Sequence, residues 1–178
     1  MKTIKYFIVA TSLAASLGLV VNVYAGPGQS RLANAAQVVF TQFAEGIRLS
    51  NKDLWRAIYT DNIEGVTQAL LDGAHINQLN QYGDTVLVLA CSKGDTGIVE
   101  LLLNNGADIN QQDGHGDTPL LWACYKGHSA IVELLLNRSA HINQPNLYGS
   151  TPLKEACSKG HAGIVKRLAF HGATLSGR

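Results

Sequence analysis

The three cysteines of the chain recur at a fixed spacing, and that spacing raises two kinds of chemistry. Cys91, Cys124 and Cys157 are each 33 residues from the next, and each follows an alanine in a short apolar segment. Thiols at matched positions could undergo reversible oxidation, or their thiolates could bind a soft metal ion such as Zn²⁺. Both chemistries require the sulfur atoms to converge, so the outcome depends on the elements that position them.

The histidines are the other candidate metal ligands, but no familiar ligand spacing connects them. The sequence contains neither an H-E-x-x-H nor a C-x-x-C motif. His128 and His161 follow matched glycines 33 residues apart, whereas His75 and His141 share a position two periods apart. We therefore expect no metal site and no cofactor.

The N-terminus has the organisation of a secretory signal peptide. Lys2 and Lys5 precede an apolar run over residues 6–23, and small residues stand before a cleavage point after Ala25. We predict that residues 1–25 are removed. The alternative is an uncleaved membrane anchor, because the run approaches the minimum spanning length of about 17 residues. Small and polar residues within the run weaken that alternative.

The net charge excludes the most common polyanionic partners. Removing residues 1–25 takes away two lysines and leaves 12 basic and 13 acidic residues, a formal net charge of −1. Such a chain lacks the basic surface that neutralising phosphate groups requires. We expect neither nucleic acid nor a membrane as partner after cleavage.

A period of 33 residues runs through the rest of the chain. Leucines, alanines and glycines fall into matched columns: Leu54, Leu87, Leu120 and Leu153; Ala57, Ala90, Ala123 and Ala156; Gly94, Gly127 and Gly160. We place four repeats at about 51–79, 80–112, 113–145 and 146–178. The whole chain is short enough to be one ordinary domain behind its leader.

Each repeat predicts two short helices. Thr118 can cap a helix N-terminus and Pro119 suits its first position, so a helix is expected over about 118–126, ending at Gly127. Apolar spacing predicts a second helix over about 129–137. A glycine with a left-handed conformation closes that helix in the other repeats, and further glycines sit at the turns between repeats.

The segment "GDTPLLWACYKGHSAIVELLLNRSAHIN", residues 116–143, resembles the ankyrin repeat. The resemblance covers about residues 51–178. It implies an all-α solenoid of helix–turn–helix units with hairpin-like tips along one edge and a concave face between the tips and the first helices. The sequence departs from the family where Val88, Leu121 and Lys154 replace a histidine and where Ser139 replaces a glycine; repeat one also lacks the Thr-Pro entry.

The two ends differ from the internal repeats, as terminal repeats must turn one face to water. The last repeat introduces Lys166 and Arg167 where the internal repeats have "EL". Residues 34–47 carry apolar side chains at helical spacing, and we expect a capping helix within 26–50, after a flexible leader at 26–33. The alternative for 34–47 is an amphipathic helix that binds a partner.

The implied stacking answers the question of the cysteines. Matched residues of neighbouring repeats should lie about 8–10 Å apart, whereas a disulfide needs Cα atoms about 4.4–6.8 Å apart. We therefore expect all three cysteines to be buried small side chains with no chemical role. The resemblance also implies structural roles for His128 and His161, whereas His115 and His171 are expected at the surface.

Motifs of catalysis are missing from the sequence. It contains no G-x-S-x-G or P-loop pattern. The glycine-rich "GHGD", residues 114–117, falls at a hairpin tip, and small stacked repeats enclose little volume in which to desolvate paired carboxylates. We expect a protein that is not an enzyme.

What remains is a binding surface. Ankyrin-like folds contact partners through the hairpin tips and the exposed side of the first helices, and aromatic side chains commonly anchor such interfaces. The residues that map there are Tyr82, Asp84, His115, Asp117, Trp122, Tyr125, Lys126, Tyr148 and Lys159. The alternative for the tyrosines is that each ring packs on the next repeat.

The predicted function is a monomeric, non-enzymatic protein-binding module exported to a bacterial periplasm. Its partner would be an endogenous enzyme that it protects or a toxin that it neutralises. Two alternatives are a thiol-based redox or metal-buffering protein and an effector secreted to act on host proteins.

Overall fold

The computed structural model describes residues 30–175 and divides the chain into two compact units, Met1–Leu49 and Ser50–Arg178. The predicted signal peptide lies outside the described residues. Helix α2 (Ser30–Tyr59) runs through the boundary between the units. It begins inside the segment expected to be a flexible leader, so that expectation is wrong for residues 30–33. Arg31, Leu32 and Ala33 are strong helix formers and extend the helix toward the N-terminus.

The expected capping role of residues 34–47 concerns contact between the two units and stays a prediction. Between Ser30 and Leu175, no helix combines the length and the apolar composition that a membrane span requires.

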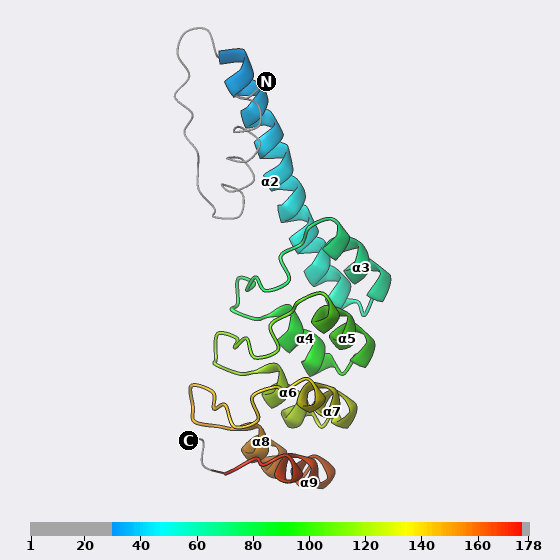
Figure 1. Cartoon of the computed structure of the whole chain (residues 1–178), viewed down its shortest axis with the longest axis vertical. Helices are drawn as coiled ribbons and strands as arrows, with labels where there is room; N and C mark the ends of the chain where they lie inside the picture. Colours follow the sequence, from blue (N-terminus) through cyan, green and yellow to red (C-terminus); the bar gives the residue numbers. More distant parts are fainter. Residues whose placement is uncertain (1–29, 176–178) are drawn as a thin grey trace. The chain divides into compact units, whose positions relative to one another are not determined.

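The second unit is a stack of helix pairs without β-strands among its described residues. The C-terminal part of α2 pairs with α3 (Ile63–Leu71), and three further pairs follow along the chain. They are α4 (Val86–Lys93) with α5 (Thr96–Asn104), α6 (Pro119–Lys126) with α7 (Ser129–Asn137), and α8 (Pro152–Ser158) with α9 (Ala162–Phe170). The pairs stack in sequence order (Figure 1), so the unit is the predicted all-α solenoid.

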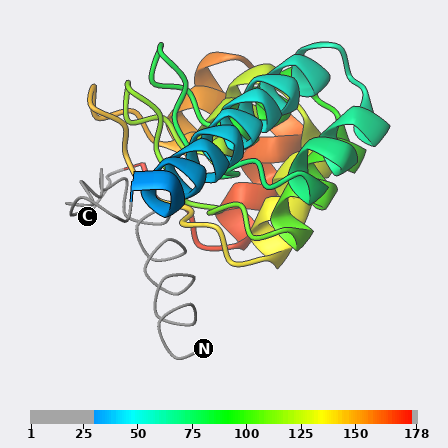
Figure 2. The same ribbon diagram turned by 90° about the horizontal axis from the view of Figure 1, so that it is seen from above.

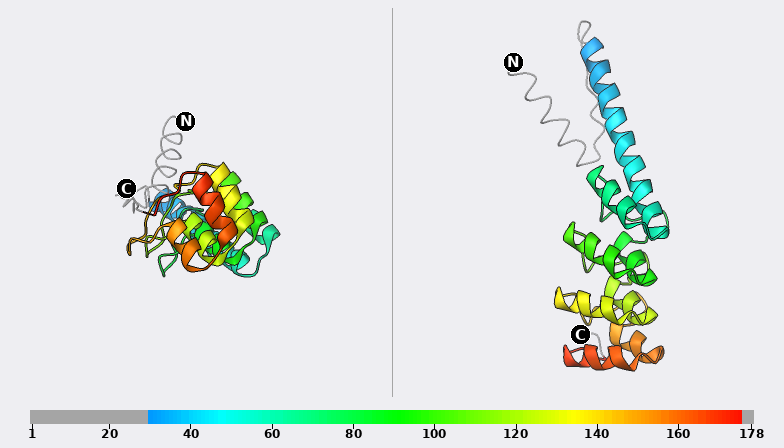
Figure 3. Two further views of the ribbon diagram at one scale, coloured as in Figure 1. Left: turned by 90° about the horizontal axis from the view of Figure 1, so that it is seen from below. Right: turned by 90° about the vertical axis from the view of Figure 1, so that its right-hand side faces the viewer.

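Two rows of helices run along this stack. The first helices form one row, in which α4 packs against α6 and α6 against α8. The second helices form the other row, in which α3, α5, α7 and α9 pack in that order. A side view shows this layering (Figure 3). Seen along the stack, the connecting loops project from one side of the helices (Figure 2).

The helix ends follow the predicted capping residues. Thr85, Thr118 and Thr151 each accept a hydrogen bond at the side-chain oxygen from the backbone N–H three residues on, over 3.0, 3.2 and 3.4 Å. Satisfying an otherwise unpaired N–H in this way stabilises a helix by about 1 kcal/mol. Gly94 and Gly127 end α4 and α6 in the left-handed conformation.

Ser139 adopts the conformation of the glycines it replaces. Its φ is 63°, compared with 87° for Gly106 at the same place in the preceding repeat. The third repeat therefore closes as the others do, with a side chain in a region that favours glycine.

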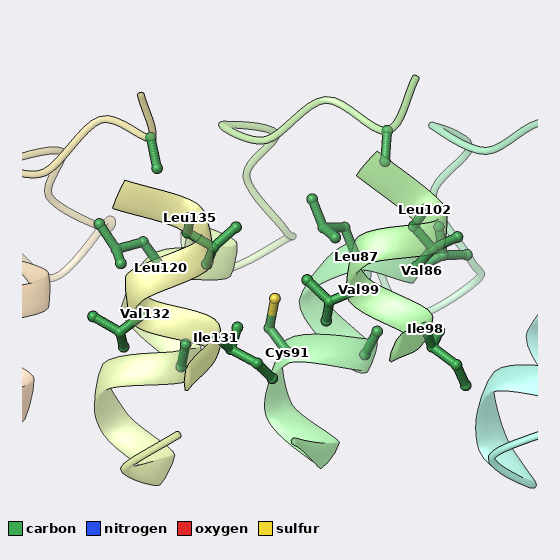
Figure 4. Close-up of a cluster of buried hydrophobic side chains, with 14 of the residues drawn as sticks. Val86, Leu87, Cys91, Ile98, Val99, Leu102, Leu120, Ile131, Val132 and Leu135 are labelled. Atoms are coloured by element: carbon green, nitrogen blue, oxygen red, sulfur yellow. The ribbon is translucent and has the colours of Figure 1, made fainter. Parts of the chain in front are cut away.

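The core lies between the two rows and continues from one repeat to the next. Leu102, Leu135 and Leu168, one in each of the last three repeats, are fully buried. Figure 4 shows the same type of side chain recurring in neighbouring repeats, with Leu87 and Val99 in one and Leu120 and Val132 in the next. Burying one such leucine stabilises the fold by about 1.5–3 kcal/mol, so stacking supplies the main stabilising contact.

A column of asparagines connects successive loops. The side-chain oxygens of Asn77, Asn110 and Asn143 each accept a hydrogen bond of 2.8 Å from a backbone N–H 31 residues later. Asn51, on α2, accepts the equivalent bond from the backbone N–H of His75 over 2.6 Å. Each loop is therefore positioned by the element before it, and the first loop is positioned by a helix.

Candidate functional site

The cysteines occupy two different environments. Cys91 and Cys124 are fully buried, whereas Cys157 is exposed, and all three are free thiols. Figure 4 shows Cys91 at the boundary between the second and third repeats. The expectation of burial is thus confirmed for two cysteines and wrong for Cys157, because the matched position in the last repeat has no following repeat to cover it.

Burial also suppresses thiolate formation at the internal positions. Desolvation raises the pKa of the Cys91 thiol far above its ordinary value, and it raises the pKa of Cys124 to about 12. The thiolate is the nucleophilic and metal-binding form. These two cysteines therefore remain neutral thiols near neutral pH, and they behave as small apolar side chains.

His128 and His161 connect repeats. The Nε2 atom of His128 lies 3.2 Å from the carbonyl oxygen of Ser92, and that of His161 lies 3.3 Å from the carbonyl oxygen of Tyr125. Each ring fills the space beside a glycine of the preceding repeat; a Cβ on Gly94 would stand 2.5 Å from the His128 ring. Their expected structural role is confirmed. Over residues 30–175, no group of three or more His, Cys, Asp and Glu side chains could hold a metal ion.

The hairpin tips share one local geometry. At each tip a side-chain oxygen of Asn80, Asp113 or Asn146 accepts hydrogen bonds from the backbone N–H groups two and four residues later. Adjacent tips are also joined through their backbones. Gly114 donates to the carbonyl of Gly83 over 2.8 Å, and Leu147 donates to that of His115 over 3.1 Å. The three tips therefore form one connected surface.

Large side chains project from this surface into solvent. Tyr82 is 72% exposed, Tyr148 is 77% exposed and Leu147 is 74% exposed, and His115 is exposed as well. The alternative that the tyrosine rings pack on the next repeat is therefore wrong for Tyr82 and Tyr148. Leu147 is not among the predicted contact residues. Its signal in the sequence is an apolar residue in a column that otherwise holds Gln81 and Gly114.

The carboxylates near the tips bind donors of the chain itself. Asp84 accepts a hydrogen bond from the side-chain amide of Asn80 over 2.9 Å, and Asp117 accepts one from Asn146 over 2.7 Å. Burial raises the pKa of Asp117, and the hydrogen bond from Asn146 opposes that rise. Asp84 and Asp117, predicted as partner contacts, are half-buried and hold neighbouring tip residues in place.

The remaining predicted contact residues form one cluster on α6 and just after α8. The rings of Trp122 and Tyr125 meet edge to face, with centroids 5.5 Å apart. The ammonium group of Lys126 lies 5.6 Å from the Tyr125 centroid, and that of Lys159 lies 4.2 Å from it. Trp122 also donates from its indole N–H to Asp113 over 3.1 Å, which fixes the ring. We call these four residues the aromatic–lysine cluster.

These features define a class of protein before they define a family. A solenoid with a continuous row of exposed tips and no paired catalytic groups among its described residues presents an extended surface for macromolecules.

The family model for ankyrin repeats, described as three copies, matches residues 54–146 and 105–177. The chain belongs to the ankyrin repeat family, whose repeats generally mediate protein–protein interaction. A search of curated protein sequences gives no match to this chain.

Proposed function

We propose that this protein is an exported, non-enzymatic module that binds a partner protein through its tips and the adjoining sides of its first helices. The observation that carries the proposal is the pair of tyrosines and the leucine exposed on the connected tips. Large side chains held on a fixed backbone lose little entropy on binding, and aromatic residues are frequent anchors of interfaces.

The experiment that tests the surface compares two sets of exposed side chains. We expect Tyr82→Ala, Tyr125→Ala and Tyr148→Ala together to abolish capture of a partner by chemical cross-linking in periplasmic extract. The control combines Leu71→Ala with Phe170→Ala, which removes side chains 77% and 87% exposed on the second helices. Capture lost equally with both sets, or retained with the tyrosine set, would refute the assignment.

The proposed compartment has its own test. The signal-like segment 1–25 supports export, with the mature chain beginning at Gly26. Mass spectrometry of the protein from fractionated cells should find that N-terminus in the periplasm. Detection in the culture medium instead would favour the secreted effector. A chain retained at full length in the membrane fraction would favour the uncleaved anchor.

The structure weighs against the thiol-based alternative. Two of the three thiols are buried with raised pKa values, so they cannot supply thiolate for redox exchange or metal binding at neutral pH. A role in protecting an enzyme or neutralising a toxin is part of the proposal, because both need only a fixed binding surface.

A further inference from the structure

The charges near the binding surface are unequally occupied. Of the carboxylates at the tips and first helices, Asp84, Asp113 and Asp117 each accept a hydrogen bond from a side chain of the same protein. Glu155 accepts one from the hydroxyl of Ser150. The acidic groups of this face are thus already engaged within the chain.

The lysines of the same face fall into two kinds. Lys93 pairs with Asp61 over 3.1 Å and donates to the carbonyl oxygen of Tyr59 over 2.8 Å. Lys126 and Lys159 occupy the same column in the next two repeats, and both are exposed. Within residues 30–175 neither of them pairs with a carboxylate, and the Tyr125 ring is their recorded partner.

The ring positions these two cations without neutralising them. An ammonium group within about 6 Å of an aromatic centroid is attracted to the face of the ring and keeps its full charge. The Trp122 and Tyr125 rings fix each other, so the Tyr125 ring is held at a set place between the two lysines. The result is a pair of positive charges beside apolar ring surface.

We propose that the partner places an acidic protein segment, with an aromatic or apolar side chain beside its carboxylates, on the aromatic–lysine cluster. This inference rests on the proposed function and specifies the chemistry of the partner. Charge complementarity selects the acidic segment, because the cluster offers two unpaired cations while the neighbouring acids are occupied. Two cations are too few to compete for nucleic acid or an anionic membrane, where affinity grows with each phosphate neutralised.

The experiment uses defined probes and the full mature chain. A fluorescein-labelled random copolymer of glutamate and tyrosine is titrated with the protein in about 50 mM and about 300 mM NaCl, since salt screens exposed charges. Duplex DNA and phosphatidylserine vesicles are titrated in parallel. We expect binding to the acidic copolymer, weakened by salt, with weaker binding to DNA and to vesicles. The fluorescence of Trp122 is followed in a Trp55→Phe background.

The variants test the two lysines directly. Lys126→Glu with Lys159→Glu should lower the association rate by about 10-fold or more, and the pair of Gln substitutions should lower it by less. The matched control is Lys166→Glu on α9, an exposed lysine of the second-helix row, which should change the rate by less than about twofold. Circular dichroism should show equal helix content in all variants.

Three results would overturn the inference. They are an absence of binding to the copolymer, tighter binding to DNA or vesicles, and equal rates for the double Glu variant and the control. The outcome is separable from that of the proposed function. A partner lost with the tyrosine set but captured equally by the double Glu variant would leave the function standing and remove the acidic segment.

Discussion

The third and fourth repeats contain nearly the same residues in different surroundings. Cys124 is fully buried, whereas Cys157 in the same column is exposed. Val132 is likewise fully buried, whereas Val165 is only half-buried. The difference arises because the fourth repeat has no fifth repeat behind it. A residue of a solenoid therefore takes its environment from its column and from its neighbours together.

The sequence of the last repeat compensates for this exposure. Arg167 replaces Leu134 in the column of second-helix residues, and it forms an ion pair with Glu133 of the preceding repeat. The substitution exchanges an apolar contact for a charge that tolerates water. Other apolar residues persist at this end, notably Phe170.

The largest expected effect is the difference in reactivity between the internal and terminal thiols. We expect Cys157 to react with a thiol reagent at least about 10³-fold faster than Cys91 or Cys124, because the latter become accessible only when the fold opens. The measurement is mass-spectrometric counting of labelled cysteines over time at pH 8, with a denatured sample as the control for full labelling. Equally fast modification of all three would contradict the packing and revive the thiol-based alternative.

A core truncation should have the next largest effect. Leu135→Ala removes a fully buried side chain of the third repeat and should lower the free energy of unfolding by about 2–5 kcal/mol. The matched control is Leu147→Ala at an exposed tip, which should leave stability nearly unchanged. Urea denaturation of both variants checks this, and a similar loss in both would mean that stacking is not the main stabilising contact.

The cysteine column offers the most direct comparison of the two repeats. Cys124→Ser places a hydroxyl in an apolar environment and should cost about 1–3 kcal/mol of unfolding free energy. Cys157→Ser, in the same column but exposed, should cost almost nothing. Thermal denaturation of the pair is the measurement. Equal losses would show that a further element covers the fourth repeat in solution.

The smallest predicted effect is a gain. Ser139→Gly should raise the free energy of unfolding by up to about 1 kcal/mol, since glycine adopts a φ of 63° without steric cost. Ser129→Gly, within helix α7, is the control and should lower it. Calorimetry distinguishes the two, and a loss for Ser139→Gly would mean that its side chain makes a compensating contact.

Much of the fold could be predicted because local signals and the 33-residue period agree. The predicted second helix, 129–137, coincides with α7 (Ser129–Asn137). Thr118 caps the first helix as expected, and Ser139 takes the conformation of its glycine counterparts. These positions depend on neighbours in sequence, and sequence records them directly.

The errors and omissions concern contacts that a period alone does not reveal. Periodicity gives Cys157 the environment of Cys124, which is correct only for a repeat with neighbours on both sides. The tip tyrosines could be located from their columns. That Lys93 is neutralised while Lys126 is not could not be predicted, because Asp61, which pairs with Lys93, has no counterpart near the other lysine.

The asparagine bonds between loops make each repeat carry its own connector to the one that follows. A copy of one 33-residue unit, inserted between two existing units, would bring a complete set of partners for both of its neighbours. The architecture is therefore open to growth or shortening by duplication and deletion of whole units. Asn51 on α2 shows that a helix can substitute for the missing earlier loop, and it marks where such growth begins.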